Sequence, residues 1–275
     1  MTSPVSLVQL AQAGKDLFYL NQENVYFPNS GANELGQMET HHFWFVERRN
    51  LILSLLRRFL KSGSSEPFLG VDVGCGTGYT AVWLTEMGLP TIGMDAQCGF
   101  SDYRREGRAY GFVQGDLLSS QFKPELDFAL LLDVLEHVPD DQAFVRKVSE
   151  MLKPGGLLLI TVPAFSWLWS KEDEEGGHFR RYSFKDLTSR VDPEGCFLRL
   201  EYKTYFYFLL LPLFIISRLI KGTVNVGNVS KSVETHPSSW VNWIFKFMLR
   251  IEGQFVKYLP LPLGSSLFVV YRKVR

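Results

Sequence analysis

The chain has 275 residues, of which 46% are hydrophobic and 21% are charged. This composition excludes a disordered or low-complexity chain, because there is enough apolar side chain to offset the entropy lost on folding. The 29 basic and 29 acidic residues balance, so the whole chain does not have the charge of a polyanion-binding protein. The length favours one large domain with additions over two independent domains.

The charge is unevenly placed along the chain. From Phe206 to Arg275 there are nine Lys or Arg and two acidic residues, so the last quarter is positive and the rest is negative. Such an asymmetry is typical of a surface that meets a charged partner. Three widely spaced cysteines without a CxxC pair predict a reduced, intracellular protein, and no apolar signal peptide follows Met1.

After an N-terminal region with a helix predicted over 43–60, the sequence alternates strand and helix. Five short apolar segments predict strands, at 68–73, 91–94, 111–114, 127–132 and 157–162. Helices are predicted between them, at 79–87, 102–109 and 141–152. This alternation predicts an α/β, doubly wound and mostly parallel sheet with helices on both faces.

The strongest motif spans the end of the first strand and the start of a helix, Val71-Asp72-Val73-Gly74-Cys75-Gly76-Thr77-Gly78. Glycines allow a sharp turn and the close approach of a ligand, and the helix N-terminus offers unpaired N–H groups. The pattern departs from the dinucleotide fingerprint GxGxxG, because Tyr79 occupies the sixth position. A nicotinamide-dependent dehydrogenase is therefore disfavoured.

Acidic residues follow the next three strands, where doubly wound sheets bind ligands. Asp95 ends the second strand, Asp116 follows the third, and Asp133 follows the fourth. The carboxylate of Asp95 can accept hydrogen bonds from both hydroxyls of a ribose. The carboxylate of Asp116 can accept a hydrogen bond from the exocyclic amine of adenine. Each acid could instead cap a helix, but three acids in register with the glycine turn favour a ligand site.

Over residues 68–164 the sequence resembles the class I S-adenosylmethionine-dependent methyltransferases of the type 11/12 kind, and distantly the ubiquinone-biosynthesis O-methyltransferases. The resemblance is carried in combination by VDVGCGTG, GMDA, the GD pair, LLLDVLEHV and LKPGGLLLITVP. It implies S-adenosyl-L-methionine as the methyl donor. Transfer in such enzymes is an in-line displacement that depends mainly on positioning.

The resemblance also implies roles for individual residues. The turn formed by Gly74, Cys75, Gly76 and Gly78 would hold the methionine part, with Asp72 near its amino group. Asp95 would bind the ribose, Asp116 with Leu117 would frame the adenine, and Asp133 would lie near the methionine end and the acceptor. Cys75 is interpreted as a small spacer rather than a nucleophile, because no base accompanies it in the sequence.

The family fold implies a seven-stranded, Rossmann-like sheet that ends in an antiparallel pair, which 197–202 and 266–272 can supply. We therefore expect a helical lid at 1–66, a catalytic core at 67–204, an apolar and basic helical insertion at 205–263, and a final strand at 264–275. Arg48, in the lid, would meet the methionine carboxylate or would simply be an exposed residue on a lid helix.

The segment from Trp167 to Tyr182 is the candidate acceptor loop, rich in aromatic and charged residues and broken by Gly-Gly. His178 is the candidate general base, because an ordinary histidine titrates near neutral pH; the alternative is a structural role beside a turn. Arg180 and Arg181 would hold an anionic group or pair with the preceding acids.

A metal site is a minority hypothesis. Asp133, Glu136 and His137 offer two oxygens and an imidazole within one short segment, and the resemblance to the ubiquinone-biosynthesis enzymes implies that a divalent ion could polarise an acceptor there. The same Glu-His pair occurs in relatives without metal, so the main expectation is that no metal is bound.

The insertion combines an uncharged segment at 205–217 with an amphipathic one at 240–257. The first is too short to span a bilayer and contains Pro212. The second has an aromatic face accompanied by Lys246, Arg250 and Lys257. Two interpretations stand: a cap packed on the core or a partner subunit, and a surface that contacts an anionic membrane.

These observations predict methyl transfer from S-adenosylmethionine to a small, lipophilic acceptor such as a quinone, an isoprenoid or a lipid-linked precursor. The alternatives are a methyltransferase for a soluble small molecule or a protein, and a non-catalytic cofactor-binding scaffold. Nucleic acid is disfavoured as a partner, because the basic residues alternate with apolar ones. The expected location is the cytoplasm. The insertion adds the alternative of peripheral association with the inner face of a membrane. The sequence does not predict an oligomeric state.

Overall fold

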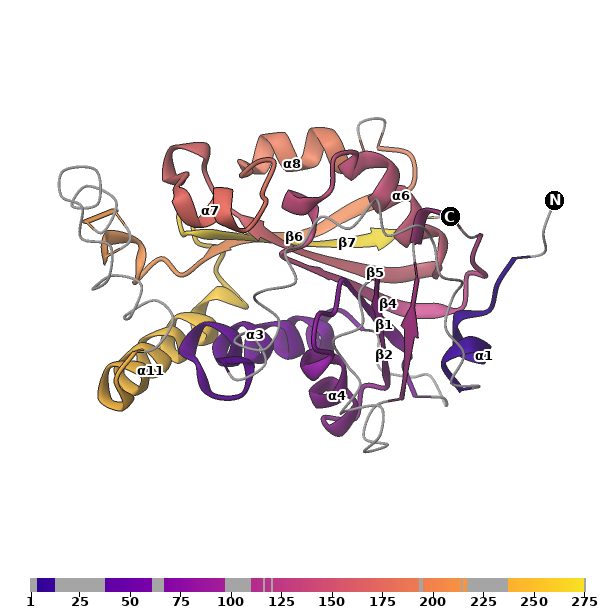
Figure 1. Ribbon diagram of the computed structural model, residues 1–275, viewed down its shortest axis with the longest axis horizontal. Coiled ribbons are helices and arrows are strands. Elements are labelled where there is room, and N and C mark those ends of the chain that lie inside the picture. The colour runs from indigo at the N-terminus through magenta and orange to yellow at the C-terminus, as the bar shows by residue number, and fades with distance from the viewer. Residues whose placement is uncertain are drawn as a thin grey trace.

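The computed structural model describes residues 4–12, 38–60, 67–96, 110–115, 117–119, 121–192, 195–213, 215–216 and 237–274. A twisted sheet lies between two layers of helices (Figure 1). The predicted helix at 102–109 lies outside the described residues, as do Asp116 and Cys98.

The sheet has seven strands in the order β3-β2-β1-β4-β5-β7-β6. The first five are mutually parallel, and β7 runs antiparallel to both of its neighbours. The predicted fold class is therefore confirmed, including the antiparallel pair at one end. The strand bounds are β1 Gly70–Val73, β2 Thr91–Asp95, β3 Gly111–Gln114, β4 Leu126–Leu132, β5 Leu152–Pro163, β6 Leu198–Phe206 and β7 Ser266–Lys273.

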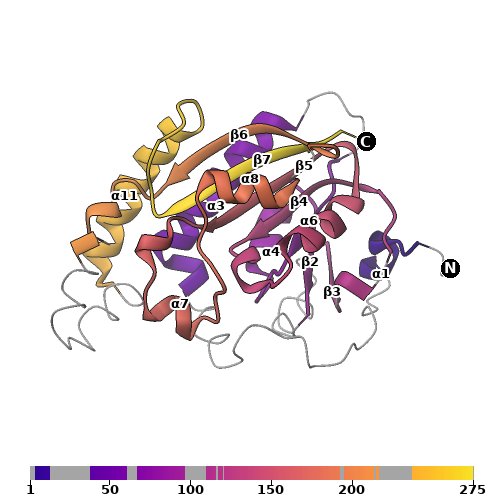
Figure 2. The same ribbon diagram turned by 90° about the horizontal axis from the view of Figure 1, so that it is seen from above.

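Helices cover both faces of this sheet, with α6 and α8 on one side and α3 and α4 on the other (Figures 1 and 2). Side chains along β5 alternate between the two layers: Leu158 and Ile160 join the core under α6 and α8, and Leu157 and Leu159 join the core beside α3. The helix bounds are α1 Leu7–Gln12, α3 Phe43–Phe59, α4 Tyr79–Glu86, α6 Asp141–Glu150, α7 Lys171–Glu175, α8 Phe184–Val191 and α11 Ser239–Val256.

Two strands are longer than the sequence pattern predicts. β5 begins at Leu152, five residues before the predicted start, because Leu152 pairs with Leu126 before a register shift in the β4–β5 ladder. β6 continues to Phe206, which pairs with Ser266. The start of the predicted insertion is therefore part of the sheet, and the chain leaves it at the edge where the parallel strands end.

The N-terminal region occupies two separate places. Val5 pairs with Phe122, and Glu125 accepts hydrogen bonds from the Ser6 hydroxyl at 2.9 Å and the Val8 amide at 3.0 Å. These contacts hold α1 beside β3, whereas α3 packs with α11 on the opposite side. The division of the chain into lid, core and insertion remains a prediction.

The helix α11 is tied to α3 and to the end of β6. Asn242 accepts a hydrogen bond from the Phe43 amide at 2.8 Å and donates one to the carbonyl of His41 at 2.9 Å. Buried Glu252 accepts hydrogen bonds from the backbone amides of Phe208 at 3.1 Å and Leu209 at 2.9 Å. In the part of the chain that is described, no helix has both the length and the apolarity needed to cross a membrane.

Candidate active site

The glycine turn connects β1 to α4. Gly74, Gly76 and Gly78 have φ angles of +74°, +57° and +85°, which L side chains rarely adopt. Gly78 is the N-cap of α4, so the turn leads directly into a helix N-terminus. A Cβ at Gly74 would lie 2.6 Å from Val134, so only glycine lets the turn approach the segment after β4.

Asp95 lies at the carboxyl end of β2, beside this turn. Its Oδ2 accepts a hydrogen bond from the Gly76 amide at 2.8 Å, and the carbonyl of Met94 accepts from the amides of Gly74 and Cys75. The structure therefore brings Asp95 to the glycine turn, as the motif predicted. The third predicted acid, Asp116, is outside the described residues, and its neighbour Leu117 is buried in the short 3-10 helix η3, Leu117–Ser119.

Arg48 and Asp133 form an ion pair between α3 and the segment after β4. Asp133 has φ +56°, and its Oδ1 accepts the Thr161 hydroxyl at 3.0 Å, while its amide donates to the Thr161 carbonyl at 3.0 Å. The sequence predicted that Arg48 would meet a ligand carboxylate or be exposed. In this structure it is buried and its charge partner is Asp133.

Asp72, on β1, is also buried. Burial raises its pKa to about 7, and Arg48 opposes that shift. Among the described residues, Oδ1 of Asp72 and Nε of Arg48 are buried without a hydrogen-bond partner. Such atoms fit a bound group that both accepts and donates hydrogen bonds, as the amino and carboxylate groups of methionine do.

Sequence analysis missed Glu39, which lies shortly before α3. Its carboxylate accepts a hydrogen bond from the Thr77 hydroxyl in the glycine turn, and its backbone carbonyl accepts one from Arg49 at 2.6 Å. Burial raises the pKa of Glu39. An acid close to the His-His-Phe-Trp segment was the available signal, but no periodicity indicated that it would reach the turn.

Cys75 is enclosed rather than reactive. Burial raises the pKa of its thiol well above the ordinary value, and the charges of Asp95 and Asp72 act in the same direction. A thiol held neutral is a poor nucleophile. Its side chain packs with Val82 and Phe112, which favours the prediction that it is a small spacer.

His178 follows α7 and is oriented by a buried carboxylate. Its Nδ1 lies 2.8 Å from Oδ1 of Asp173, which is also held by two hydrogen bonds from Arg181, at 2.8 and 3.0 Å. Burial alone would raise the pKa of Asp173, but the hydrogen bonds from His178 and Arg181 hold it well below its usual range. The resulting carboxylate orients the imidazole of His178, so its second nitrogen can accept a proton.

His178 meets the segment after β4. Its ring packs edge-on against that of His137, with centroids 4.6 Å apart, and the Phe179 amide donates to the Glu136 carbonyl at 2.7 Å. Burial lowers the pKa of His137 to about 4, and His178 acts in the same direction, so His137 is neutral at physiological pH. The candidate base therefore lies next to the loop that carries Asp133.

Glu136, His137 and His178 each offer a ligand atom, and these atoms lie within 4.8 Å of one another. The sequence grouped Asp133 with Glu136 and His137, whereas the structure brings His178 to the Glu-His pair. Burial and the charge of Asp133 raise the pKa of Glu136 well above its ordinary value. Three such ligands fit a divalent ion in composition, and metal binding remains a prediction.

The two arginines after His178 have structural partners. Arg181 binds Asp173, an acid of the preceding run, as predicted. Arg180 instead donates to the carbonyls of Val138 at 2.8 Å and Pro139 at 3.0 Å and to Asp141 at 3.1 Å. Arg180 therefore ties the candidate acceptor loop to the start of α6, and Arg181, which also donates to the Ala164 carbonyl at 3.3 Å, ties it to the end of β5.

Residues 71–160 match the family described as a methyltransferase domain. A curated relative, the ubiquinone biosynthesis O-methyltransferase of Chelativorans sp., is 32% identical over 114 residues, which is 35% of this chain and 42% of the relative. The chain thus spans less than half the length of that curated relative.

Two solved structures have a similar fold. One is the methyltransferase solved in complex with the Haloferax volcanii Trm112 methyltransferase activator: TM-score 0.57, 16% identity, covering 93% of this chain and 100% of that one. The other is the N-methyltransferase NodS of Bradyrhizobium japonicum, in complex with S-adenosyl-L-homocysteine: TM-score 0.53, 15% identity, covering 92% and 100%.

Residues 71–160 therefore match a methyltransferase domain, and the sheet that contains them has the fold of these two solved structures. The resemblance of its motifs to S-adenosylmethionine-dependent methyltransferases is confirmed over residues 71–160.

We expect Gly74→Ala to weaken the binding of S-adenosylhomocysteine by about tenfold or more. Alanine rarely adopts the positive φ of this position, and its Cβ would push Val134 away from the turn. Gly88→Ala is the matched control: Gly88 has φ +86°, but a Cβ there meets nothing within 4 Å. Isothermal titration calorimetry should show normal affinity for Gly88→Ala. Equal affinities in the two variants would contradict the role of the turn.

Asp72 should make stability fall as pH rises. Between about pH 4 and 7 the unfolded chain has released the Asp72 proton while the folded chain retains it, so ionisation favours unfolding. Buried His137 acts in the opposite sense between about pH 4 and 6.5, which makes a direct comparison necessary. The free energy of unfolding of the parent protein relative to Asp72→Asn should decrease by on the order of 3 kcal/mol over this range, measured by urea denaturation. Parallel pH profiles would refute the assignment.

Proposed function

We propose that this protein transfers a methyl group from S-adenosylmethionine to a hydroxyl or amine of a small, lipophilic acceptor. The methyltransferase-domain match and the glycine turn with Asp95 support the donor. The relative from Chelativorans is named as a ubiquinone biosynthesis O-methyltransferase, which is in keeping with a lipophilic acceptor. Peripheral association with a membrane is part of the proposal.

On the donor side, the turn and Asp95 would hold the nucleoside, and Asp72 with Arg48 would hold the methionine part. S-adenosylmethionine supplies a sulfonium methyl group that is open to nucleophilic displacement. The buried polar atoms of Asp72 and Arg48 that lack protein partners in the described structure are suited to the charged ends of methionine. The protein contributes orientation and exclusion of water.

On the acceptor side, His178 would take the proton of the acceptor as the new bond to methyl forms and the bond to sulfur breaks. Asp173 holds the imidazole in the required orientation and stabilises the charge that develops on it. The contact with His137 places His178 beside the loop that follows β4. This arrangement serves either a hydroxyl or an amine acceptor.

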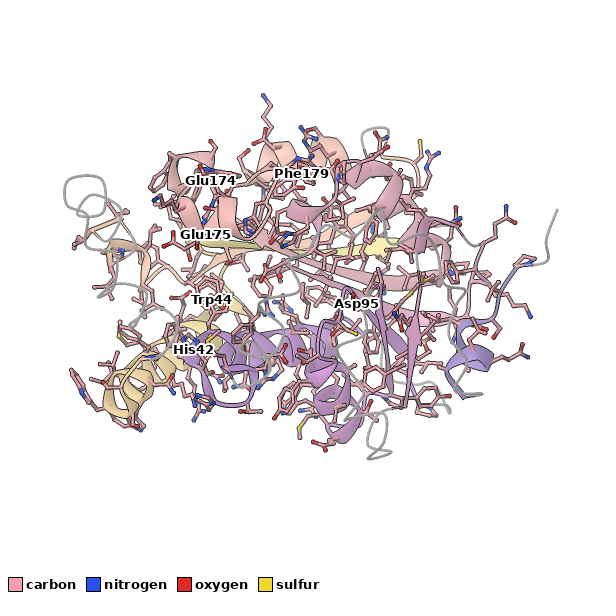
Figure 3. All side chains as sticks on the ribbon, in the orientation of Figure 1. His42, Trp44, Asp95, Glu174, Glu175 and Phe179 are labelled. Carbon is pink, nitrogen blue, oxygen red and sulfur yellow. The ribbon has the colours of Figure 1, made fainter. Side chains whose placement is uncertain are left out.

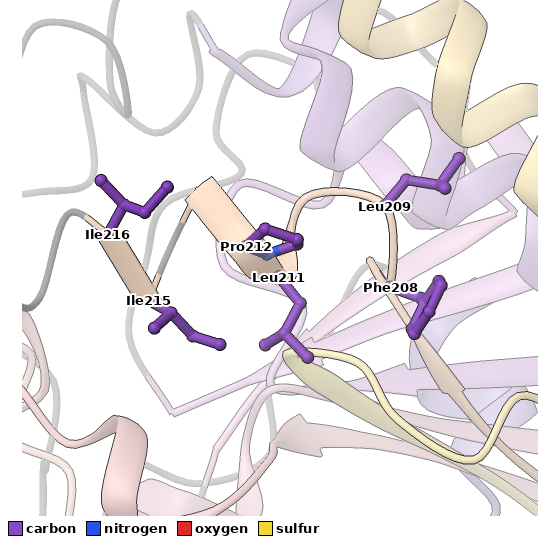
Figure 4. Close-up of a pocket in the computed structure, with 6 residues that line it drawn as sticks. All are labelled: Phe208, Leu209, Leu211, Pro212, Ile215 and Ile216. Atoms are coloured by element: carbon purple, nitrogen blue, oxygen red, sulfur yellow. The ribbon is translucent and has the colours of Figure 1, made fainter.

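The observation that favours a lipophilic acceptor is an apolar cavity beyond the end of β6 (Figure 4). The cavity has a volume of about 360 Å³ and is lined by Phe208, Leu209, Leu211, Pro212, Ile215 and Ile216. Ser266 at the start of β7 pairs with Phe206, the last residue of β6, and with Pro163, the last residue of β5. The cavity therefore lies towards the edge where the parallel strands end, which is the ligand-binding edge of such sheets.

Tyr207 connects this cavity to the candidate site. Its ring stacks on Trp44 with centroids 3.7 Å apart, and its hydroxyl donates to the Trp44 carbonyl at 2.9 Å. The charge of Arg48 also acts on Tyr207, whose pKa burial raises well above the ordinary value. An apolar ligand in the cavity would therefore lie next to the aromatic wall that borders the Arg48–Asp133 pair.

The direct test is incubation of the protein with methyl-labelled S-adenosylmethionine and a cell extract, followed by partition between organic and aqueous phases. We expect label in the organic phase. Label in the aqueous phase would replace the proposal with a soluble acceptor, and absence of transfer would favour a cofactor-binding scaffold. Asp95→Ala is the negative control, because loss of this carboxylate should prevent the binding of the methyl donor and therefore the transfer of label.

His178→Ala should lower the turnover number by about a hundredfold or more and leave the affinity for S-adenosylhomocysteine unchanged, because only proton transfer is lost. Added imidazole should restore part of the turnover. Glu174→Gln, a neighbouring change on α7, is the matched control and should retain full activity. Unchanged turnover in His178→Ala would exclude His178 as the base.

A further inference from the structure

The helix α11 presents a continuous aromatic stripe to solvent. Trp240, Trp243, Phe247 and Phe255 are 68%, 66%, 55% and 63% exposed, and Ile244 and Ile251 lie on the same face. Positions 240, 244, 247, 251 and 255 recur at intervals of three and four, so they form one side of the helix. The rings of Trp243 and Phe247 are stacked, 5.9 Å apart.

This stripe is large for a surface that meets only water. The four aromatic side chains together expose on the order of 500 Å². That value is already comparable to the largest apolar patch of a typical monomeric protein, and such patches commonly mark an interaction site. Isolated exposed apolar residues need no such explanation, but a stripe along four turns of one helix does.

The other side of α11 is fixed. Leu249, Glu252 and Val256 are buried, and the hydrogen bonds of Asn242 join the helix to the start of α3. Figures 1 and 2 show α11 beside α3 at one end of the molecule. The stripe is therefore held in a defined orientation and does not have to order on binding.

The charges that α3 and α11 expose are all positive. Their acidic residues, Glu47 and Glu252, are only 3% and 4% exposed. Arg57, Arg58 and Arg250 are exposed, and Lys246 is partly exposed. Lys246 precedes Arg250 by four residues, so the two lie on the same side of α11. Partial burial lowers the pKa of Lys246. Arg250 reaches Glu47 at 3.4 Å, and its side chain remains 64% exposed.

We infer that the exposed face of α11 binds the surface of an anionic lipid bilayer. Aromatic side chains suit the boundary between headgroups and acyl chains, and flanking Lys and Arg are attracted to lipid phosphates. A second copy of the chain fits less well, because pairing two such faces would bring like charges together. The inference deepens the proposed function, since a lipophilic acceptor would reside in that bilayer.

Binding is tested without turnover, so its failure and the failure of methyl transfer can be distinguished. Sedimentation with vesicles of phosphatidylcholine alone, and of phosphatidylcholine mixed with phosphatidylglycerol, measures partitioning directly. We expect binding to the anionic vesicles that weakens as salt is added, and about tenfold weaker binding to the neutral ones.

The stripe is tested with Trp243→Ser combined with Phe247→Ser, which should reduce partitioning to anionic vesicles about tenfold or more. The control Met87→Ser removes an exposed apolar side chain at the end of α4 and should bind normally. Lys246→Gln should weaken binding to anionic vesicles and leave binding to neutral ones unchanged. Thermal unfolding of each variant checks that the fold is retained.

The inference is overturned if the double variant binds vesicles as well as the parent protein does. It is also overturned if the parent binds neither kind of vesicle and sediments as a dimer that the double variant converts to a monomer. That second result would assign the stripe to a partner copy. Methyl transfer can succeed or fail independently of either outcome.

Discussion

A guanidinium cannot remain charged inside a protein without compensation, and Arg48 is the buried cation around which this site is built. Burial alone would lower its pKa, but the carboxylate of Asp133, which pairs with it, opposes that shift, and Glu39 and Asp72 act in the same direction. These groups come from the segment after β4, the residues before α3, and β1. Arg48 thus ties α3 to the segment after β4, and removal of Asp133 would leave a buried charge without compensation for its desolvation cost.

An aromatic stack lies close to Arg48. Trp44 lies one turn before Arg48 on α3, and it stacks on Tyr207 at the point where β6 ends. The apolar segment that lines the cavity begins directly after Tyr207. Glu252 of α11 accepts hydrogen bonds from the amides of the next two residues, Phe208 and Leu209. The candidate site, the cavity and α11 are therefore linked through Tyr207 and Glu252.

Much of the fold and half of the site were predictable from local pattern. Apolar segments indicated the five parallel strands, because a buried parallel strand needs continuous apolar side chains. The antiparallel pair at the end of the sheet was expected from the resemblance, and its two strands are rich in strand-forming residues. The ends of β5 and β6 were not predicted, since the β4–β5 register shift and the pairing with β7 depend on distant strands. The glycine turn and Asp95 were predictable, because backbone geometry at Gly74 and Gly76 requires glycine. The contacts of Glu39 and the partner of Arg48 were not.

The sequence by itself determined the alternation of elements, the glycine turn and the amphipathic pattern of 240–257, since each depends on residues close together along the chain. Tertiary structure alone decided that Arg48 pairs with Asp133, 85 positions away, and that Asp173 orients His178 beside His137. It also decided which face of α11 is buried and which is exposed. The physical reason is that burial and pairing of charge depend on which strands end at the same edge of the sheet, and no local propensity encodes that.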